Sequence, residues 1–232
     1  DQDSYFGLKT YDINQESVYV NAIFNSIIGD TRNKFKAGLS FAYDNFEEIV
    51  NGGVFNRREQ SAGAFFEYAF DNLENVSLTA GLRVDSHNQL GTFVTPRFHL
   101  RYAPAGKSVL RLSFGRGKKI ANIFAENQKM FATGRTINLP SNTTNGVYGL
   151  NPEIAWNYGV SFMQGFNLFD KKGDITFDYY RTDFVKAVVV DWEQAQEISF
   201  YNLDGNSTAN SFQLETNYEV VEHANLRLAY KY

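Results

Sequence analysis

The sequence contains no cysteine in its 232 residues, which excludes a disulfide scaffold, cysteine-based zinc sites and thiol chemistry. Proline is also scarce, with four residues, and neither sign of charge dominates: 22 basic and 26 acidic side chains give a formal net charge of -4. This balance provides no broad basic field, so we expect no nucleic-acid partner. With 43% hydrophobic residues, the composition is that of a folded chain rather than a disordered or collagen-like one.

Long hydrophobic runs are absent as well. The longest strictly apolar stretch is Ala187 to Val190, whereas a helix that spans a membrane needs roughly 20 apolar residues. A transmembrane β-strand needs only about 9 to 11 residues, of which every second one is apolar, so the hydropathy does not exclude a membrane. The first residues, Asp1 to Ser4, show no basic region followed by an apolar one. We therefore expect the chain to start at a mature terminus or at an internal cut rather than at a signal peptide.

The sequence is rich in aromatic side chains, with 21 Phe and 14 Tyr. It also shows a hydrophobic pattern that repeats every two residues. Apolar and polar residues alternate through 76–85, 209–221 and 225–232, which predicts strands with one apolar face. Helical periodicity is weak, and only Ala121 to Ala132 predicts a short helix. Ten strands are expected, at residues 17–28, 34–45, 60–70, 75–85, 93–102, 108–116, 155–169, 174–190, 209–221 and 225–232.

The connections between these strands alternate in length. Short turns are expected at 29–33, 71–74, 103–107, 170–173 and 222–224. Long connections rich in Asn, Gly, Ser and Thr are expected at 46–59, 86–92, 117–154 and 191–208. Outer-membrane barrels place short turns on the periplasmic side and long loops outside, whereas a β-sandwich has no reason to alternate in this way. The pattern predicts antiparallel up-and-down strands of a transmembrane β-barrel.

Aromatic residues at strand ends fit a girdle at the membrane interface. They are Tyr68, Phe70, Tyr102, Trp156, Tyr158, Phe166, Phe177 and Tyr179. If the short turns are periplasmic, both ends of the chain lie outside the cell, which is out of phase with a complete bacterial barrel. We therefore expect residues 1–232 to form part of a single outer-membrane barrel domain of a longer chain.

One run of motifs resembles a known family. Residues 95–104 and 110–117 form a hairpin that ends in Gly115-Arg116-Gly117, and Ala121-Asn122 follows. After a long loop, Asn151-Pro152-Glu153 leads into the next strand. This order is similar to the barrel of TonB-dependent outer-membrane receptors. The motifs cover about 95–160, and the hairpin rhythm covers most of 60–232. The sequence departs from the family at Lys118-Lys119, where Phe-Arg is usual, and in its shortened Asn-Pro run.

The resemblance implies a barrel of 22 strands with a plugged lumen, of which this chain would supply ten. It implies a receptor in the bacterial outer membrane that binds a scarce nutrient: a ferric siderophore, cobalamin, a metal chelate or a glycan. Import would use energy from the TonB complex, which would act through an N-terminal plug and TonB box that this chain lacks. Outer-membrane lipid and a surface lipoprotein would be further partners, and no cofactor is implied.

Basic residues gather on the polar faces of three consecutive strands. Hairpin pairing would bring them into one stripe on the lumen wall, formed by Arg83, Arg97, His99, Arg101 and Arg111. Pairing with carboxylates such as Asp85 is the structural explanation for such a stripe. Steering of an anionic solute through the lumen is the functional alternative.

Ligand contacts are expected in the long loops, where aromatic and basic side chains suit sugar faces, siderophore rings and anionic groups alike. The candidates are Phe55, Arg57, Arg58, Lys118, Lys119, Phe131, Arg135, Trp192 and Tyr201. Each also fits a solvated or loop-packing role. The three histidines, His87, His99 and His223, lie on separate elements without acidic residues at ligand spacing, so we expect no metal centre.

No catalytic set emerges, because the sequence has no nucleophile-elbow motif and its carboxylates are scattered. We therefore expect a protein that is not an enzyme. Two alternatives remain at this point: a complete small ten-stranded outer-membrane barrel acting as an enzyme or an adhesin, and a soluble β-sandwich binding domain.

Overall fold

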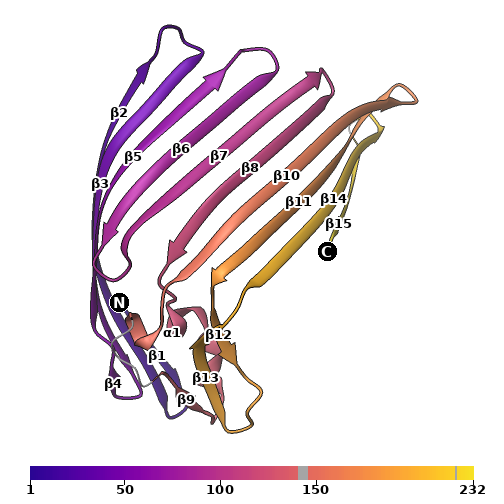
Figure 1. The fold of residues 1–232 in the computed structure, drawn as a ribbon. Helices are drawn as coiled ribbons and strands as arrows, with labels where there is room; N and C mark the ends of the chain where they lie inside the picture. Colours follow the sequence, from indigo (N-terminus) through magenta and orange to yellow (C-terminus); the bar gives the residue numbers. More distant parts are fainter. Residues whose placement is uncertain (141–145, 223) are drawn as a thin grey trace.

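The computed structural model describes residues 1–140, 146–222 and 224–232. Its main feature is one antiparallel sheet with the strand order β1-β2-β3-β5-β6-β7-β8-β10-β11-β14-β15, in which the short β4 pairs with β3. Figure 1 shows this sheet as a curved, open wall. Its strands are β1 (Gln2–Phe6), β2 (Lys9–Ile27), β3 (Asn33–Val50), β4 (Gly53–Val54), β5 (Arg57–Asp71), β6 (Val76–His87), β7 (Gly91–Ala105), β8 (Ser108–Lys119), β10 (Glu153–Leu168), β11 (Lys171–Lys186), β14 (Ser207–Val221) and β15 (Ala224–Lys231).

The ten strands predicted from the sequence are confirmed as β2, β3, β5, β6, β7, β8, β10, β11, β14 and β15. The strand expected at 174–190 ends earlier than predicted, because β11 stops at Lys186 and residues 188–190 belong to a second sheet. The five tight connections lie together at the upper end in Figure 1, and most of the longer ones lie at the lower end. The β10–β11 turn consists of Phe169 and Asp170, which have positive φ values of 50° and 59°. Two such residues allow a two-residue hairpin whose twist matches that of its strands.

Three expectations about the elements were wrong in detail. The first hairpin is longer than expected, because Tyr11 of β2 pairs with Val50 of β3. The connection expected at 86–92 is short, since β6 continues to His87 and β7 begins at Gly91. Phe177 lies in the middle of β11 rather than at a strand end, because this strand begins three residues earlier than the alternation suggested.

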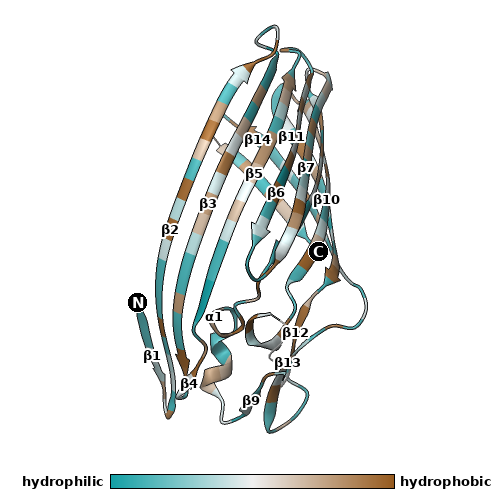
Figure 2. Cartoon of the chain, turned by 60° about the vertical axis from the view of Figure 1, so that its left-hand side comes forward, coloured by the Kyte–Doolittle hydropathy of each residue, from teal (hydrophilic) through white to brown (hydrophobic). Residues whose placement is uncertain are grey.

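The register keeps apolar side chains in rows across the wall. Phe66, Leu82 and Pro96 occupy one row on three neighbouring strands, and Leu112 pairs with Val160 in the same way. Figure 2 shows the alternation of hydrophilic and hydrophobic residues along β2 and β3. A single curved sheet with one apolar face is a barrel segment, and the sandwich alternative, which needs two stacked sheets, does not describe this fold.

A second, smaller sheet lies at the loop end. It consists of β12 (Val188–Asp191), β13 (Glu197–Asn202) and β9 (Thr136–Asn138) in the order β12-β13-β9, with β13 and β9 parallel. The helix expected at 121–132 is confirmed as the short α1 (Ile123–Glu126) and the 3-10 helix η1 (Gln128–Ala132), and a further 3-10 turn, η2 (Val147–Gly149), precedes β10. Among the described residues, no helix is long and apolar enough to cross a membrane.

Candidate functional site

The loop end contains the hydrophobic core of the molecule. Phe131 stacks on Phe6 and on Tyr11, with ring centroids 5.4 Å apart in both pairs. Phe124 lies 5.1 Å from Phe55 and 5.2 Å from Tyr148. These rings come from β1, β2, the β4–β5 connection and the long β8–β10 connection. Apolar burial therefore folds the long connections into a packed unit over one end of the wall.

A buried ion pair lies beneath this aromatic core. Arg57 Nη1 is 2.8 Å from Glu48 Oε2, and the two side chains are 6% and 1% exposed. Arg57 also pairs through Nε with Glu59 at 2.9 Å and places its guanidinium 3.9 Å from the ring centroid of Phe46. A charge pair this deep is tolerated only where further hydrogen bonds satisfy both groups.

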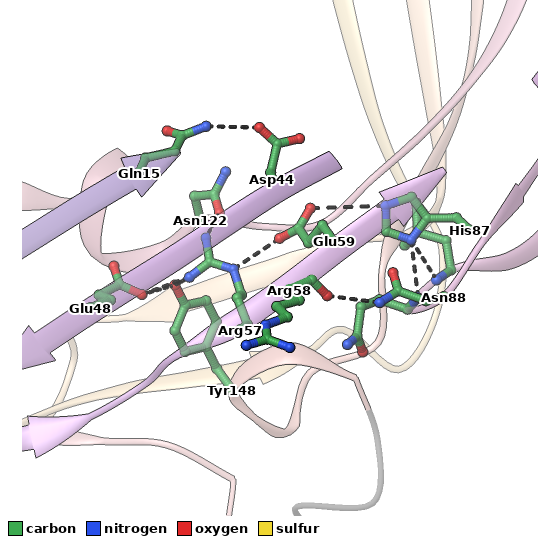
Figure 3. A network of polar contacts seen from close by, with 12 residues as sticks. Gln15, Asp44, Glu48, Arg57, Arg58, Glu59, His87, Asn88, Asn122 and Tyr148 are labelled. Carbon is green, nitrogen blue, oxygen red and sulfur yellow. Dashed lines mark hydrogen bonds and ion pairs between the residues drawn. The ribbon is translucent and has the colours of Figure 1, made fainter. Parts of the chain in front are cut away.

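The long β8–β10 connection supplies those further bonds, as Figure 3 shows. Arg57 Nη2 donates to Asn122 Oδ1 at 2.7 Å, and Arg57 Nη1 contacts Tyr148 Oη at 2.8 Å. The Tyr148 hydroxyl donates to Glu48, and the Tyr11 hydroxyl donates to the same carboxylate at 3.1 Å. The network joins the wall strands β2, β3 and β5 to residues on both sides of the longest connection.

The electrostatics keep both tyrosines neutral. Burial raises the pKa of Tyr148 above its ordinary value, and there the cation Arg57 and the anion Glu48 act in opposite directions. Burial together with the charge of Glu48 raises the pKa of Tyr11. For Arg57, burial lowers the pKa, but the Glu59 and Glu48 carboxylates favour the charged guanidinium and the pKa is raised. The cluster therefore holds fixed charges and neutral hydroxyl donors.

A cleft of about 840 Å³ opens beside this network. Its lining combines polar and apolar groups: the amide side chains of Asn45, Asn56 and Gln89 and the charged side chain of Arg58 lie beside the Phe55 ring and further apolar side chains. The backbone of η2 closes one side: Tyr148 has a φ of 58°, between Gly146 at 61° and Gly149 at 73°. A cleft of this size with amide, guanidinium and aromatic groups is suited to holding a small polar molecule.

The predicted loop residues fall into different environments. Phe55, Arg57 and Arg58 all line the cleft, but the Arg57 side chain is largely enclosed in the ion-pair network. Phe131 is only 1% exposed and belongs to the aromatic core. Its side chain is thus packed against the protein in this conformation.

The remaining loop candidates lie away from the cleft. Arg135 Nη1 donates to the Trp192 carbonyl at 3.0 Å. Lys119 pairs with Glu126 at 3.1 Å and with Glu153 at 3.2 Å. Lys118, expected in a loop, lies at the end of β8, and Tyr201 is exposed on β13. The structure therefore brings together only part of the predicted set.

The five residues of the basic stripe share the polar face of β6, β7 and β8. Arg83 pairs with Asp85 at 2.6 Å, and Arg97 pairs with Glu67. Arg101 stands directly opposite Arg111 in the register, and His99 stands opposite Ser113. A cavity of about 620 Å³ lies over His99, Arg101 and Arg111.

Carboxylate partners therefore balance the charges of Arg83 and Arg97, which form the part of the stripe nearer the loop end. Within the described part of the chain, neither Arg101 nor Arg111 has a carboxylate at salt-bridge distance. No group of three or more acidic or histidine side chains with metal-binding geometry occurs among the described residues either. His223 lies outside those residues.

Sequence reasoning missed Glu48, Tyr11, Asn122 and Tyr148. A signal for Glu48 was available, because Phe46, Glu48 and Val50 continue the alternation of β3 beyond the expected end of the strand at residue 45. A charged residue at an inward position of a strand needs a buried partner. No local feature of the sequence indicates that this partner is Arg57, or that Tyr148 completes the hydrogen-bond network around the pair.

Comparisons with known proteins agree with the architecture. The family model described as "TonB dependent receptor-like, beta-barrel" matches residues 1–232. The siderophore receptor PirA of Pseudomonas aeruginosa aligns with a TM-score of 0.64 at 15% identity, over 96% of this chain and 44% of its own. The Serratia marcescens hemophore receptor HasR, solved with its hemophore HasA and heme, gives 0.67 at 13% identity, over 97% and 42%.

The copper transporter OprC gives a TM-score of 0.66 at 12% identity, over 96% of this chain and 39% of its own. At these identities the likeness to the solved structures shows the fold alone. The chain spans less than half the length of each of these three proteins. No curated protein matches the sequence.

Proposed function

The chain belongs to the TonB-dependent receptor β-barrel family, and we propose on this premise that it is part of an outer-membrane receptor that imports a scarce nutrient. The solved relatives are a siderophore receptor, a hemophore receptor and a copper transporter. The nutrient would accordingly be a ferric siderophore, cobalamin, another metal chelate or a glycan. Import would draw on energy from the TonB complex, delivered to a part of the protein beyond this chain.

One observation carries the proposal: the long connections fold over one end of the wall and leave a cleft of about 840 Å³ there, lined by polar and apolar side chains. At the opposite end, the described residues connect the strands through tight turns (Figure 1). In a barrel with an apolar outer band, the end with long loops faces the outside of the cell. A molecule arriving from outside would meet this cleft first.

Within the cleft, Phe55 and Arg58 are the proposed ligand contacts, because both line it. Arg57 would act indirectly, by fixing the wall on which Arg58 stands. The second sheet lies beside the cleft and carries Tyr201 on β13, while Trp192 and Arg135 flank its other strands. These three residues would contact a larger ligand or a surface lipoprotein. The protein would perform binding followed by a gated conformational step, without covalent chemistry.

For the lumen, we propose that Arg83 and Arg97 serve mainly to hold the wall together through their carboxylate partners. Arg101 and Arg111 face each other with like charges, which is unfavourable unless an anion lies between them. They are therefore the pair proposed to attract an anionic group in the lumen. Replacement of both by Gln should reduce uptake at low salt more than at high salt.

The proposal is tested in the source bacterium with the gene deleted. Uptake of labelled ferric siderophores, heme, cobalamin, copper and oligosaccharides is measured, and we expect one class to be lost and then restored by the wild-type gene. Loss of TonB should abolish uptake of that class while surface binding persists. Arg58→Gln should weaken binding, and Lys172→Gln, at the turn end, should not. Uptake that continues unchanged without the gene or without TonB would contradict the proposal.

A further inference from the structure

The turn η2 closes one side of the cleft with a backbone conformation that L-amino acids rarely adopt. Tyr148 has a φ of 58° and a ψ of 20°, in the left-handed region, where Cβ crowds the following carbonyl oxygen. Gly146 and Gly149 have positive φ values in the same turn, but glycine has no Cβ and adopts this region without strain. At Tyr148 the conformation costs free energy, which contacts elsewhere must offset.

Hairpin geometry accounts for the other residues of the described chain that have a side chain and a positive φ. They lie in short connections between strands that pair directly, and they are Asn51, Leu73, Phe169 and Asp170. Short hairpin turns require this backbone region. The turn η2 closes no hairpin, because β9 before it and β10 after it belong to different sheets. The conformation of Tyr148 therefore depends on what its side chain contacts.

The Tyr148 side chain reaches from the cleft to the buried ion pair (Figure 3). Its hydroxyl donates to the Glu48 carboxylate and accepts from Arg57 Nη1 at 2.8 Å. Hydrogen bonds to ionised groups are about twice as strong as those between neutral groups. The ring also meets Phe124 edge to face, with the centroids 5.2 Å apart. One side chain thus fixes η2 to the wall strands β3 and β5.

The chain directly after η2 is held by other contacts. The Asn151 N–H donates to Asn202 Oδ1 at 2.7 Å, and Asn202 Nδ2 donates to the Asn151 carbonyl at 3.0 Å. Leu150 is 4% exposed and belongs to the aromatic core. Loss of the Tyr148 hydroxyl would therefore release η2 and leave the following residues in place. The cleft-lining residues of this turn would move with it: Gly146, Val147 and Gly149.

From these observations we propose that Tyr148 is a positioning residue of the cleft, whose hydroxyl holds the strained η2 against the Glu48–Arg57 pair and thereby sets the width of the cleft. Another part of the lining is rigid, because Asn45 and Arg58 stand opposite each other in the ladder of β3 and β5. The position of η2 then decides which molecules fit. This inference rests on the proposed role of the cleft in nutrient binding.

The first test compares two phenylalanine variants of the full-length receptor in detergent. Tyr148→Phe removes the hydroxyl that anchors η2. Tyr11→Phe is the matched control, because the Tyr11 hydroxyl donates to the same Glu48 carboxylate at 3.1 Å from a residue of β2 in the aromatic core. Each variant takes one donor from Glu48, but only Tyr148→Phe releases η2. The reporter is hydrogen exchange of the Leu150 amide, which donates to the Val147 carbonyl at 3.0 Å within this turn.

We expect the Leu150 amide to exchange about tenfold faster in Tyr148→Phe than in the wild type, since the variant loses hydrogen bonds to two charged groups. Tyr11→Phe should exchange at the wild-type rate. The same rate in all three proteins would overturn the inference. Equal acceleration by both variants would overturn it too, because the two hydroxyls would then be interchangeable supports of the ion pair.

The second test separates ligand fit from a loss of folded receptor. The concentration dependence of uptake is measured for whichever labelled probe needs the gene: ferric siderophore, heme, cobalamin, copper or oligosaccharide. Tyr148→Phe should raise the half-saturation concentration about tenfold and leave the maximal rate unchanged, because a wider cleft weakens binding alone. Lys172→Gln, at the turn end, should change neither value. A lower maximal rate at an unchanged half-saturation concentration would reduce Tyr148 to a structural residue.

The two proposals fail separately. If the chain does not belong to a nutrient receptor, uptake of every labelled probe will continue without the gene, while the exchange of the Leu150 amide still tests the anchor. If only the role of Tyr148 is wrong, uptake of one probe will need the gene, and Tyr148→Phe will match the wild type in both exchange and half-saturation.

Discussion

The Glu48 carboxylate lies 2.8 Å from the Arg57 guanidinium, in surroundings that leave the two side chains 1% and 6% exposed. The pair connects β3 to β5, and hydrogen bonds to Asn122 and Tyr148 extend it to the longest connection of the chain. Removal of one partner from such a pair leaves an uncompensated buried charge. The pair therefore couples the wall to the folded loops.

The first prediction concerns this coupling. Glu48→Gln should destabilise the loop end by about 3 kcal/mol, because Arg57 keeps its charge but loses its most deeply buried partner. Hydrogen exchange of the α1 and η1 amides in the full-length protein should accelerate by about a hundredfold. Asp30→Asn breaks an exposed pair with Arg32 at the turn end and should leave these amides unchanged. Unchanged exchange in Glu48→Gln would show that the pair does not hold the loops.

A second prediction concerns pH. Burial lowers the pKa of His87, and the charge of Lys118 lowers it too, while the carboxylates of Glu59, Asp85 and Asp44 raise it. Neutral His87 accepts hydrogen bonds at Nδ1 from the Gln89 and Leu90 amides, at 3.0 and 3.3 Å. A histidine whose folded pKa is depressed contributes stability that is complete above the unfolded pKa, about 6.5, and is lost as pH falls through the folded pKa.

The β6–β7 connection should therefore loosen progressively as the pH falls below the ordinary histidine pKa of about 6.5 and through the lower pKa of folded His87. The measurement is hydrogen exchange of residues 88–90 at pH 7.5 and pH 5, corrected for the intrinsic exchange rate. His87→Gln should remove most of the difference between the two pH values. Persistence of that difference in the variant would place its cause elsewhere.

A third prediction uses a glycine that makes room for an ion pair. A Cβ at Gly63 would lie 2.2 Å from Asp85 Oδ1 and 2.8 Å from Arg83 Nη2. Gly63→Ala should displace the Arg83–Asp85 pair and lower stability by about 1 to 3 kcal/mol. At Gly117 a Cβ would meet nothing within 4 Å, so Gly117→Ala is the matched control.

The readout for both glycine variants is the temperature at which the folded barrel loses its compact migration on an unboiled SDS gel. We expect a lower transition for Gly63→Ala alone. If both variants lost compact migration at the same temperature, the Arg83–Asp85 pair would be able to shift without a loss of stability.

A fourth prediction tests the two faces of the wall with adjacent residues of β14. Leu214 pairs with Phe177 and Tyr230 on the apolar face, whereas Gln213 pairs with Asp178 and Lys231 on the polar face. Leu214→Arg should cost about 2 to 4 kcal/mol, because it places a charge in lipid. Gln213→Arg, beside Asp178, should be tolerated. The fraction of compact barrel on an unboiled SDS gel is measured for both variants. If Gln213→Arg lowered this fraction more than Leu214→Arg, the two faces of the wall would have to be assigned the other way round.

The sequence by itself determined the ten long strands of the wall, their faces and the two kinds of end. A period of two is a local property, and tight turns such as Phe169-Asp170 fix the register of each hairpin once the apolar face is set. For this reason Arg83, Arg97 and Arg111 could be assigned to one polar face without any structure. The alternation of apolar and polar residues, together with that of short and long connections, also identified the antiparallel wall and its apolar rows.

Only the tertiary structure decided what the long connections do. Tyr11, Glu48, Arg57, Asn122 and Tyr148 are distant in the sequence, and no periodicity relates them. Packing alone selects such partners, because a buried charge is stable only where several donors and acceptors converge on it. Nonlocal packing also decides the place of Phe131. The sequence analysis predicted it as a ligand contact, and the fold buries it in the aromatic core. Local pattern thus specifies the wall, and nonlocal burial specifies the site that the wall supports.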